Sequence, residues 1–442
     1  MPSSSATRAA RGAVSPAREC AMRVIRRVFE QGAYADRALA SEAAGLDPRD
    51  RALAMALSYG TVQRRATLDH IAAQLVDRRL ERLEAPVLAA LRLGLFELLF
   101  LGGVTDYAAV NESVELAKRA SPHGAGLVNA VLRRAAREGA GLLEGLSDET
   151  PAGAALLHSV PDWLAVKWWD ELGGDEARRL MRVVNQPAES AMRVNALAAT
   201  SESVVAALPV ASHRAVDPAG GALGDLPEAL VLDGPFDVQS SELWRSGAVA
   251  PQSRASMLVS RILDPRPGER VLDLCAAPGG KTTHMAALMG DQGAIVAVER
   301  HPGRAAALER TALRLRATSV RVEVADAGET RTDGPFDRVL VDPPCSGLGT
   351  LQSRPDLRWR VRPETIGELA GLQARILAAG AHVLRPGGTL VYSVCTISRQ
   401  EGPEVLERFV GEHPDFSAES VLQLLPHRDG TDGFFIARLM RC

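Results

Sequence analysis

The stretch Val271-Leu-Asp-Leu-Cys-Ala-Ala-Pro-Gly-Gly-Lys-Thr-Thr283 decides the fold of the C-terminal half of this chain. An aliphatic run at 271–274 breaks into small residues, a proline and two glycines, and then enters a helix-compatible segment at 282–289. This pattern predicts a strand, a tight turn and a helix N-terminus, where backbone N–H groups face any nearby ligand. Glu299 follows at the end of the next apolar run, 294–298, where a doubly wound sheet holds a nucleotide ribose.

Other interpretations of this loop have weaker support. Residues 280–282 match the Gly-Lys-Thr end of a phosphate-binding P-loop, but the first glycine of that motif would stand where the chain has Cys275. A GxGxxG dinucleotide turn does not occur here, and a plain strand–turn–helix without a ligand stays open. Against that plain interpretation, only three residues of the chain are lysine, and one of them, Lys281, lies in the glycine loop.

Two further predicted strands end at cysteines. The run 336–341 is followed by Asp342-Pro-Pro-Cys345, and proline cannot continue a central strand, so the chain must turn there. The run 388–394 ends at Cys395. Consecutive strands usually pair, at a spacing of about 5 Å. We therefore expect Cys345 and Cys395 to share one crevice at the carboxyl edge of the sheet, where such folds bind ligands.

These motifs resemble those of the Sun/Fmu family, bacterial RNA cytosine-5 methyltransferases that modify small-subunit ribosomal RNA with S-adenosylmethionine. The resemblance in the C-terminal half rests on Asp273-Leu-Cys-Ala-Ala-Pro-Gly-Gly-Lys281, Glu299, Asp326, Asp342-Pro-Pro-Cys345, Cys395-Thr396 and Asp432-Gly-Phe-Phe-Ile-Ala-Arg-Leu439. Upstream, residues 15–140 resemble the helical NusB fold, especially at 109–118 and 127–133.

The patterning and the resemblance together predict a multidomain protein, because 442 residues exceed one ordinary domain. The expected order is a disordered tail at 1–15, an all-α NusB-like RNA-binding bundle at 16–140, a linker at 141–153, a small α+β subdomain at 154–235 and a Rossmann-like α/β domain of the class I S-adenosylmethionine-dependent methyltransferases at 236–442. Helical apolar periodicity marks the bundle, and alternating strands and helices mark the last domain. A helix is expected at 366–384.

The resemblance implies roles for individual residues. Cys395 is implied to be the nucleophile that attacks C6 of cytosine, and Cys345 to assist its release after methyl transfer. Asp342 is expected at the N3–N4 edge of the base. The implied contacts of the cofactor, S-adenosylmethionine, are Cys275, Ala276, Ala277, Pro278, Gly279, Gly280, Lys281, Glu299, Asp326 and Asp342. Among these, Glu299 is expected at the ribose and Asp326 at the adenine amine.

The chain departs from the family pattern at three places near these motifs. Val394 precedes the second cysteine where the family usually has Thr. The segment 398–403 lacks the usual Pro-Glu-Glu-Asn string and keeps one acidic residue, Glu401. Gln252-Ser253 stands where Gln-Asp is common. These changes bear on substrate details and leave the expected reaction type unchanged.

Composition constrains the compartment and the partners. No apolar run reaches the roughly 18–20 residues of a membrane span, and the Ser/Ala/Arg-rich first 15 residues have no apolar core of a secretory signal. The five cysteines form no C-x-x-C pair, so neither a metal site nor a disulfide framework is expected. We expect a cytoplasmic protein with no membrane or metal partner. The sequence gives no prediction of the oligomeric state.

RNA is the expected macromolecular partner. Residues 1–140 carry 20 Lys and Arg against 15 Asp and Glu, although the whole chain has a net charge of −3. Arg354, Arg358 and Arg360, with Trp359 among them, follow the Asp-Pro-Pro-Cys loop, and we expect them to meet phosphates and bases.

Two other functions stay open from the sequence. The chain could be a non-catalytic, antitermination-like RNA-binding factor in which the NusB-like bundle is the working part. It could also be a cytosine-5 methyltransferase of transfer RNA or DNA. The DNA enzymes usually take their nucleophile from the Pro-Cys motif, here Cys345, and lack a second cysteine, so Cys395 favours RNA.

Overall fold

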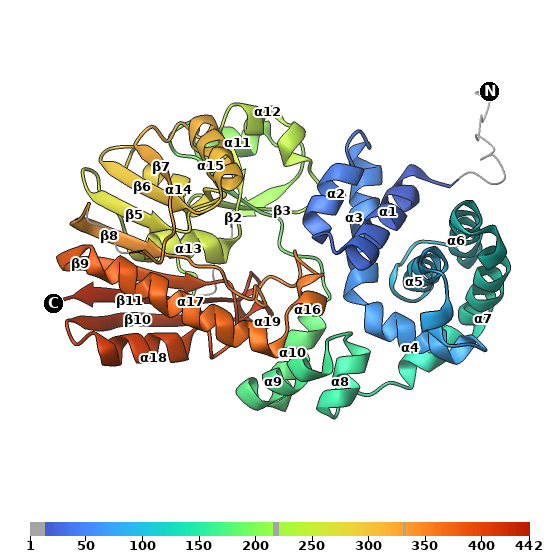
Figure 1. Cartoon of the computed structure of the whole chain (residues 1–442). Helices are drawn as coiled ribbons and strands as arrows, with labels where there is room; N and C mark the ends of the chain where they lie inside the picture. Colours follow the sequence, from blue (N-terminus) through green and yellow to red (C-terminus); the bar gives the residue numbers. More distant parts are fainter. Residues whose placement is uncertain (1–13, 215–220, 330–332) are drawn as a thin grey trace, which may run out of the picture. The chain divides into compact units, whose positions relative to one another are not determined.

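A computed structural model of the protein describes residues 14–214, 221–329 and 333–442 (Figure 1). The chain divides into two compact units. The first runs to Gln186 and includes Ser353–Trp359, and the second comprises Pro187–Gln352 and Arg360–Cys442. The predicted disordered tail lies outside the described residues except for its last two positions, so it stays a prediction, as do the predicted domain boundaries.

The first unit is helical, as predicted for the N-terminal bundle. Its helices are α1 (Pro16–Gln31), α2 (Ala35–Glu42), α3 (Pro48–Gln63), α4 (Arg65–Leu75), α5 (Ala85–Phe100), α6 (Asp106–Ala120), α7 (Ala125–Glu144), α8 (Pro151–Leu157), α9 (Asp162–Leu172) and α10 (Gly174–Val183), with short 3-10 turns η1 (Leu80–Arg82) and η2 (Pro122–Gly124). Helix α5 is apolar on nearly all sides and therefore lies in the middle of the bundle, with α1, α3, α4, α6 and α7 packed around it. No helix within the described ranges is both long and apolar enough to cross a membrane.

Local sequence explains where these helices begin. Pro16, Pro48 and Pro151 each occupy the first turn of a helix. A backbone N–H at that position has no partner within the helix, so proline, which lacks one, costs no hydrogen bond there. The Asp47 side chain caps α3 by accepting hydrogen bonds from the next N–H groups, and Thr105 caps α6 in the same way.

The segment 353–359 belongs to the helical unit although residues on both sides of it in the sequence belong to the second unit. Arg358, at the start of α16 (Leu357–Arg360), is fully buried, and burial lowers its pKa to about 9. Its guanidinium donates to the backbone carbonyls of Gln63, Ser159 and Val184 at 3.3, 3.2 and 2.9 Å, and to the side-chain oxygen of Asn185 at 2.8 Å.

The neighbouring Trp359 is held in the same way, because its indole N–H donates to the Val62 carbonyl at 2.8 Å. The expectation that Arg358 contacts RNA is therefore wrong, because its side chain is fully buried. For Trp359, which is half-buried, an RNA contact stays a prediction. Both side chains are part of the packing of the helical unit, and the pattern of arginines around a tryptophan could not distinguish an RNA contact from an internal anchor.

We predict that Arg358→Met lowers the free energy of unfolding of the helical unit by about 3 kcal/mol, because buried carbonyl groups lose a charged donor. Thermal denaturation followed by circular dichroism measures the change. The matched control is Arg354→Met, since Arg354 is exposed in the same segment. Equal melting temperatures for the two variants would contradict this role of Arg358.

A small antiparallel sheet opens the second unit. Its strands are β1 (Ala191–Val194), β2 (Ser212–Arg214), β3 (Ala229–Leu232) and β4 (Val249–Pro251), in the order β2-β3-β1-β4, accompanied by α11 (Ser201–Ala207), η3 (Val238–Ser240) and α12 (Glu242–Arg245). This arrangement confirms the predicted small α+β region.

The second sheet of the described residues has seven strands. Its strands are β5 (Arg270–Leu274), β6 (Ala294–Glu299), β7 (Val320–Val324), β8 (Phe336–Val341), β9 (Leu384–Val394), β10 (Phe416–Leu424) and β11 (Phe434–Arg441). They lie in the order β10-β11-β9-β8-β5-β6-β7, in which β7, β6, β5, β8 and β9 are parallel and β11 is antiparallel to both neighbours. The predicted Rossmann-like α/β fold is therefore confirmed.

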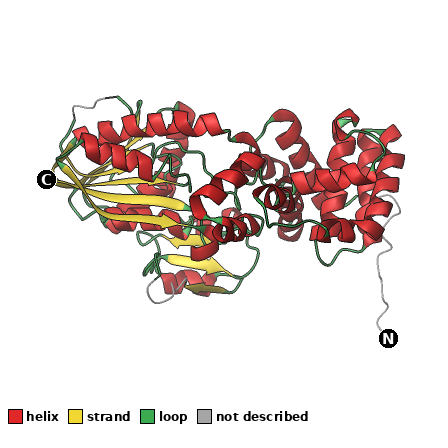
Figure 2. Cartoon of the chain, turned by 90° about the horizontal axis from the view of Figure 1, so that it is seen from below, coloured by secondary structure: helices red, strands yellow, loops and turns green. Residues whose placement is uncertain are grey.

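Helices cover both faces of this sheet (Figure 2). The helices are α13 (Arg254–Leu263), α14 (Gly280–Leu288), α15 (Pro302–Arg314), α17 (Pro363–His382), α18 (Pro403–Glu412) and the short α19 (Pro426–Asp429). Successive strand residues alternate between two cores: Leu272 and Leu274 pack with α17 and α18, whereas Val271 packs with α13 and α14. Burial on both faces explains why the central strands are continuous apolar runs.

One boundary differs from its prediction. The helix expected at 366–384 is α17, which begins three residues earlier and ends at His382, and Leu384 already belongs to β9. The reason is pairing with the neighbouring strand: Leu384 is in register with Phe336 of β8, and the Phe336 N–H donates to the Val383 carbonyl at 2.9 Å.

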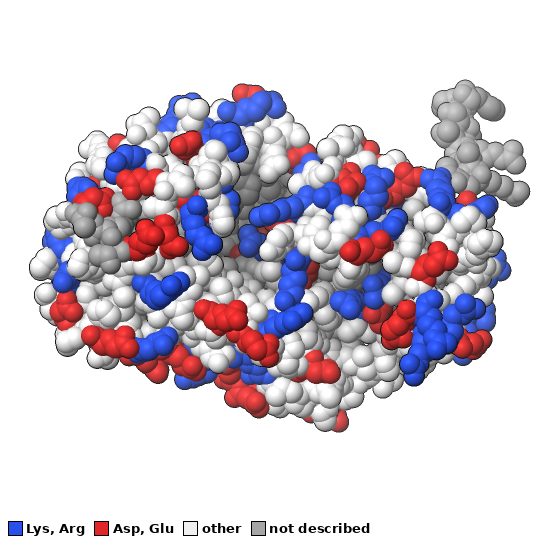
Figure 3. All heavy atoms as spheres, viewed as in Figure 1, with Lys and Arg blue, Asp and Glu red and all other residues white. Residues whose placement is uncertain are grey.

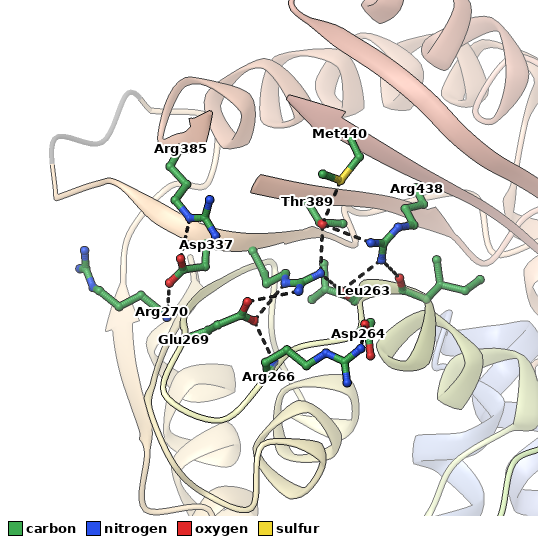
Figure 4. Close-up of polar contacts among 12 residues, drawn as sticks. Leu263, Asp264, Arg266, Glu269, Arg270, Asp337, Arg385, Thr389, Arg438 and Met440 are labelled. Carbon is green, nitrogen blue, oxygen red and sulfur yellow. Dashed lines mark hydrogen bonds and ion pairs between the residues drawn. The ribbon is translucent and has the colours of Figure 1, made fainter. Parts of the chain in front are cut away.

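Ion pairs join the strands at the amino edge of the sheet (Figure 4). Arg338 of β8 donates to Glu269 at 3.0 Å and to the Thr389 hydroxyl of β9 at 3.0 Å. Arg385, also on β9, bonds the Asp337 carboxylate at 2.6 Å. The contacts of Arg338 with Thr389 and of Arg385 with Asp337 join β8 to β9 at the edge opposite the predicted crevice. They therefore help to set the register of this strand pair along its whole length.

Candidate active site

The topology places the predicted crevice at the carboxyl edge of β5 and β8. From β5 the chain crosses to β6 and then β7 on one side, and then returns to β8 on the other side of β5. A sheet that reverses direction in this way leaves a crevice at the switch point. The loop that follows β5, residues 275–279, and the loop that follows β8, beginning at Asp342, therefore face one another across it.

The two predicted cysteines meet at this edge. Strands β8 and β9 are parallel, with Val341 opposite Tyr392, so the chain leaves both strands at the same level. The Sγ atoms of Cys345 and Cys395 lie 3.2 Å apart, within hydrogen-bonding distance for two sulfurs. Both residues are half-buried.

The pKa of the Cys345 thiol is raised well above its usual value. The largest cause is its hydrogen bond with Cys395, followed by burial and by the negative charges of Cys395, Glu401 and Asp342. By geometry, either sulfur can be the donor in the contact between them.

A lysine–aspartate pair lies beside the sulfurs. Lys281 Nζ contacts Asp342 Oδ2 at 2.8 Å, and the Ser393 hydroxyl donates to Asp342 Oδ1 at 2.9 Å. Burial acts to lower the pKa of Lys281, but the negative charges of Asp342, of a thiolate at Cys395 and of Asp273 outweigh it and raise that pKa. Lys281 is therefore a permanent cation that attracts negative charge on Cys395.

The glycine loop has the tight conformation that its sequence predicts. Cys275 and Gly279 have positive φ angles of 69° and 103°, and the Ala276 N–H donates to the Val298 carbonyl of β6 at 2.9 Å. The φ of Gly279 is one that residues with a side chain rarely adopt, and a Cβ there would also meet Leu308 Cδ1 at 2.5 Å, so glycine is favoured. A Cβ at Gly280 would have no neighbour nearer than 4.0 Å, so there is open space beside the N-terminus of α14.

The predicted carboxylates stand at successive strand ends. Glu299, the last residue of β6, is 3% exposed, and its Oε1 accepts from the His301 N–H at 2.8 Å. Arg304 lies 3.4 Å from the same carboxylate and donates to the Ala277 carbonyl at 2.8 Å, so it links Glu299 to the glycine loop. Asp326, two residues after β7, accepts from the Gly328 N–H at 2.8 Å.

Several polar residues at this edge were not among the predicted site residues. Ser393 and Arg304 bond the residues above, and Glu401 contacts both cysteine-bearing loops. The only sequence signal for Glu401 was its place as the single acidic residue in a segment that departs from the family pattern.

Three family models match the chain. The model described as 16S rRNA methyltransferase RsmB/F matches residues 260–440, the NusB family matches 15–137, and the ferredoxin-like domain of RsmF/B-like methyltransferases matches 160–239. The fold and these matches define the class of the protein: it is an RNA methyltransferase whose cofactor is S-adenosylmethionine.

Curated relatives cover almost the whole chain. The probable ribosomal RNA small subunit methyltransferase B of Bacillus subtilis is 34% identical, over 96% of this chain and 98% of that protein. Ribosomal RNA small subunit methyltransferase B of Thermus thermophilus is 37% identical, over 89% of each. The crystal structure of PH0851 covers 97% of this chain and 99% of its own, at a TM-score of 0.80 and 28% identity. The chain belongs to the RsmB/F family of 16S rRNA methyltransferases.

The residues at the crevice fit S-adenosylmethionine. Carboxylates such as Glu299 and Asp326 accept hydrogen bonds from hydroxyl and amine groups, which this cofactor carries on its ribose and adenine. The open space beside Gly280 lets a ligand approach the loop backbone closely.

Asp273, within β5, provides a test of the electrostatics of the crevice. It is 1% exposed, and its Oδ2 accepts from the Thr282 hydroxyl at 2.6 Å. Burial raises the pKa of Asp273 to about 7, and the negative charge of Asp342 adds to the shift. Between pH ~4 and ~7, the folded state therefore keeps a proton on Asp273 that the unfolded state has already released.

We predict that this proton makes the protein less stable as pH rises through that window. Relative to Asp273→Asn, the wild type should lose on the order of 4 kcal/mol between pH ~4 and ~7. Urea unfolding of both proteins at several pH values measures the difference. A difference that stays constant with pH would contradict the raised pKa of Asp273.

Proposed function

We propose that this protein transfers a methyl group from S-adenosylmethionine to C5 of a cytosine in small-subunit ribosomal RNA, through a covalent bond between Cys395 and C6. The observation that carries the proposal is the distance of 3.2 Å between the Sγ atoms of Cys345 and Cys395. C5 of cytosine is a poor nucleophile, and addition of a thiolate at C6 makes it reactive.

The surroundings support a division of roles between the two cysteines. The raised pKa of Cys345 keeps that residue a neutral thiol, which can donate a hydrogen bond to the Cys395 sulfur. The Lys281 ammonium attracts negative charge on Cys395. Since the thiolate is the reactive form of cysteine, Cys395 is the better nucleophile of the pair.

The covalent steps follow from this arrangement. The Cys395 thiolate forms a bond to C6 with its own electron pair, and the C5=C6 π electrons become available at C5. When bound, S-adenosylmethionine would supply an electrophilic methyl group, which bonds to C5 with these electrons while the cofactor sulfur keeps the electrons of the broken S–CH3 bond and becomes a neutral thioether. The C5 proton then leaves to water, its electron pair re-forms the C5=C6 bond, and Cys395 Sγ departs with the electrons of the C6–S bond. The Cys345 S–H donates to the departing sulfur and so assists release.

Asp342 lies next to this pair and can hold the base. Its carboxylate has two partners, Lys281 and Ser393, which leaves acceptor capacity for the N3–N4 edge of cytosine. An anion at that edge stabilises a proton on N3 and therefore the charge that develops when C6 is attacked. A cytosine in a helix must first leave the stack, at a cost of a few kcal/mol.

For cofactor binding we propose the loop 275–281 with Glu299 at the ribose and Asp326 at the adenine amine. These groups lie at the ends of β5, β6 and β7, the three neighbouring strands on one side of the switch point. The carboxylates of Glu299 and Asp326 are spaced along one edge of the sheet, which suits a ligand that extends from the switch point toward β7.

The choice of ribosomal RNA is supported by the names of the relatives and by the NusB-like helical unit, to which we assign RNA docking. Charge alone does not locate the docking surface: Figure 3 shows Lys and Arg side chains interspersed with Asp and Glu over the face that it draws. A cytoplasmic location, where its substrate is made, is part of the same proposal.

Separate substitutions of the two cysteines test the mechanism. Cys395→Ala should abolish methyl transfer and form no covalent complex with RNA. Cys345→Ala should still form the adduct but release it slowly, so that kcat falls about 100-fold and a protein–RNA complex accumulates. Denaturing gel electrophoresis with labelled RNA measures both outcomes.

The matched control for this experiment is Cys442→Ala, since Cys442 is exposed at the C-terminus. It should behave as the wild type. The mechanism is wrong if Cys395→Ala methylates normally, or if the adduct forms in Cys395→Ala and not in Cys345→Ala.

The substrate is tested in cells with and without the protein. Bisulfite sequencing should find a 5-methylcytosine in small-subunit ribosomal RNA that disappears with the gene and returns with the wild type but not with Cys395→Ala. A mark that disappears from transfer RNA instead would overturn the proposed substrate and leave the reaction type standing.

A further inference from the structure

Glu401 is a fully buried carboxylate close to the cysteine pair, and none of the roles assigned above involves it. It lies in the loop between β9 and α18. Its Oε1 accepts from the Ser346 N–H at 2.7 Å and from the Gln373 side-chain amide at 3.1 Å. Its Oε2 accepts from the hydroxyls of Ser346 at 2.5 Å and Thr396 at 3.2 Å. Both oxygens are therefore satisfied, as a buried carboxylate requires.

The partners of Glu401 connect it to both sulfurs. Ser346 directly follows Cys345, and Thr396 directly follows Cys395. The two hydroxyls also lie 2.8 Å from each other. One side chain thus bonds the residues next to both cysteines and closes a polar ring between the loop after β8 and the end of β9.

Helix α17, which covers this face of the sheet, also stabilises the ring. Gln373 of α17 also donates to the Pro344 carbonyl at 3.0 Å, one residue before Cys345. The Tyr392 hydroxyl, from β9, donates to the Glu401 carbonyl at 2.5 Å. The backbone at Glu401 is therefore anchored to β9, while its side chain holds the Cys345 loop.

We propose that Glu401 is a positioning residue for methyl transfer, which holds the Cys345 thiol at its working distance from Cys395. The inference rests on the proposed function, because it assigns Glu401 to the same two-cysteine chemistry. A misplacement of about 1 Å in reacting groups can reduce a rate about 100-fold, so a tie between the two loops matters for turnover.

Two substitutions separate the ties from the charge. Glu401→Gln can keep every link: its amide oxygen accepts from the Ser346 N–H and Gln373, and its amide nitrogen donates to hydroxyls that rotate to accept. Glu401→Ala removes all four links. If positioning is the role of Glu401, the glutamine variant should retain most of the function that the alanine variant loses.

The experiment measures kcat, KM for RNA, the Kd of S-adenosylmethionine and the melting temperature of the full-length protein. For Glu401→Ala we expect kcat to fall about 100-fold, with KM and Kd within about twofold of the wild type. Glu401→Gln should recover at least about tenfold of that loss. The matched control is Glu407→Gln, since Glu407 is exposed on α18 nearby, and it should leave all four quantities unchanged.

A normal kcat in Glu401→Ala overturns the inference, and so does a glutamine variant as slow as the alanine variant. If Glu401→Ala does not fold, Ser346→Ala takes its place: it removes one tie, and an unchanged kcat in that variant also overturns the inference. A wild type that makes no 5-methylcytosine would instead refute the proposed function, so the two failures are distinguishable.

Discussion

The parallel pairing of β8 with β9 is the constraint on which the site depends. Its register places Val341 opposite Tyr392, so Asp342 and Ser393, the next residues, also stand side by side and share a hydrogen bond of 2.9 Å. The two chains leave the sheet at one level, and their cysteines meet at 3.2 Å. A shift of one residue would turn every side chain of one strand to the other face and separate these groups.

The electrostatics of the crevice follow from what the two loops bring together. Asp342 and Glu401 concentrate negative charge in a largely buried site, while Lys281 supplies the opposing cation. Asp342 adds to the rise in the pKa of Cys345, and its negative charge also raises the pKa of Lys281. The two thiols therefore have different surroundings: the pKa of Cys345 is raised, and the positive charge of Lys281 acts on Cys395.

Much of this could be predicted from the sequence, because the decisive features are local. Apolar runs that end in Asp342-Pro-Pro-Cys345 and at Cys395 specify two strands that end near a cysteine, and neighbouring parallel strands share an edge. Arg358 and Glu401 could not be interpreted in this way. The partners of Arg358 lie between 173 and 295 residues away in the chain, and those of Glu401 come from a loop, a helix and a strand end, so only the folded chain shows that each is an internal anchor. The end of α17 was missed for a similar reason, since pairing with β8 decides it.

The most direct test of the account is whether the two thiols meet in solution. A trivalent arsenical, which bonds two neighbouring thiols at once, should bind the folded protein with one arsenic per chain, and mass spectrometry after digestion should find it bridging the peptides that contain Cys345 and Cys395. Bridging should be lost in either single Cys→Ala variant. If the wild type binds no bridging arsenic, or binds it through any other pair of cysteines, the convergence of β8 and β9 on one crevice is contradicted.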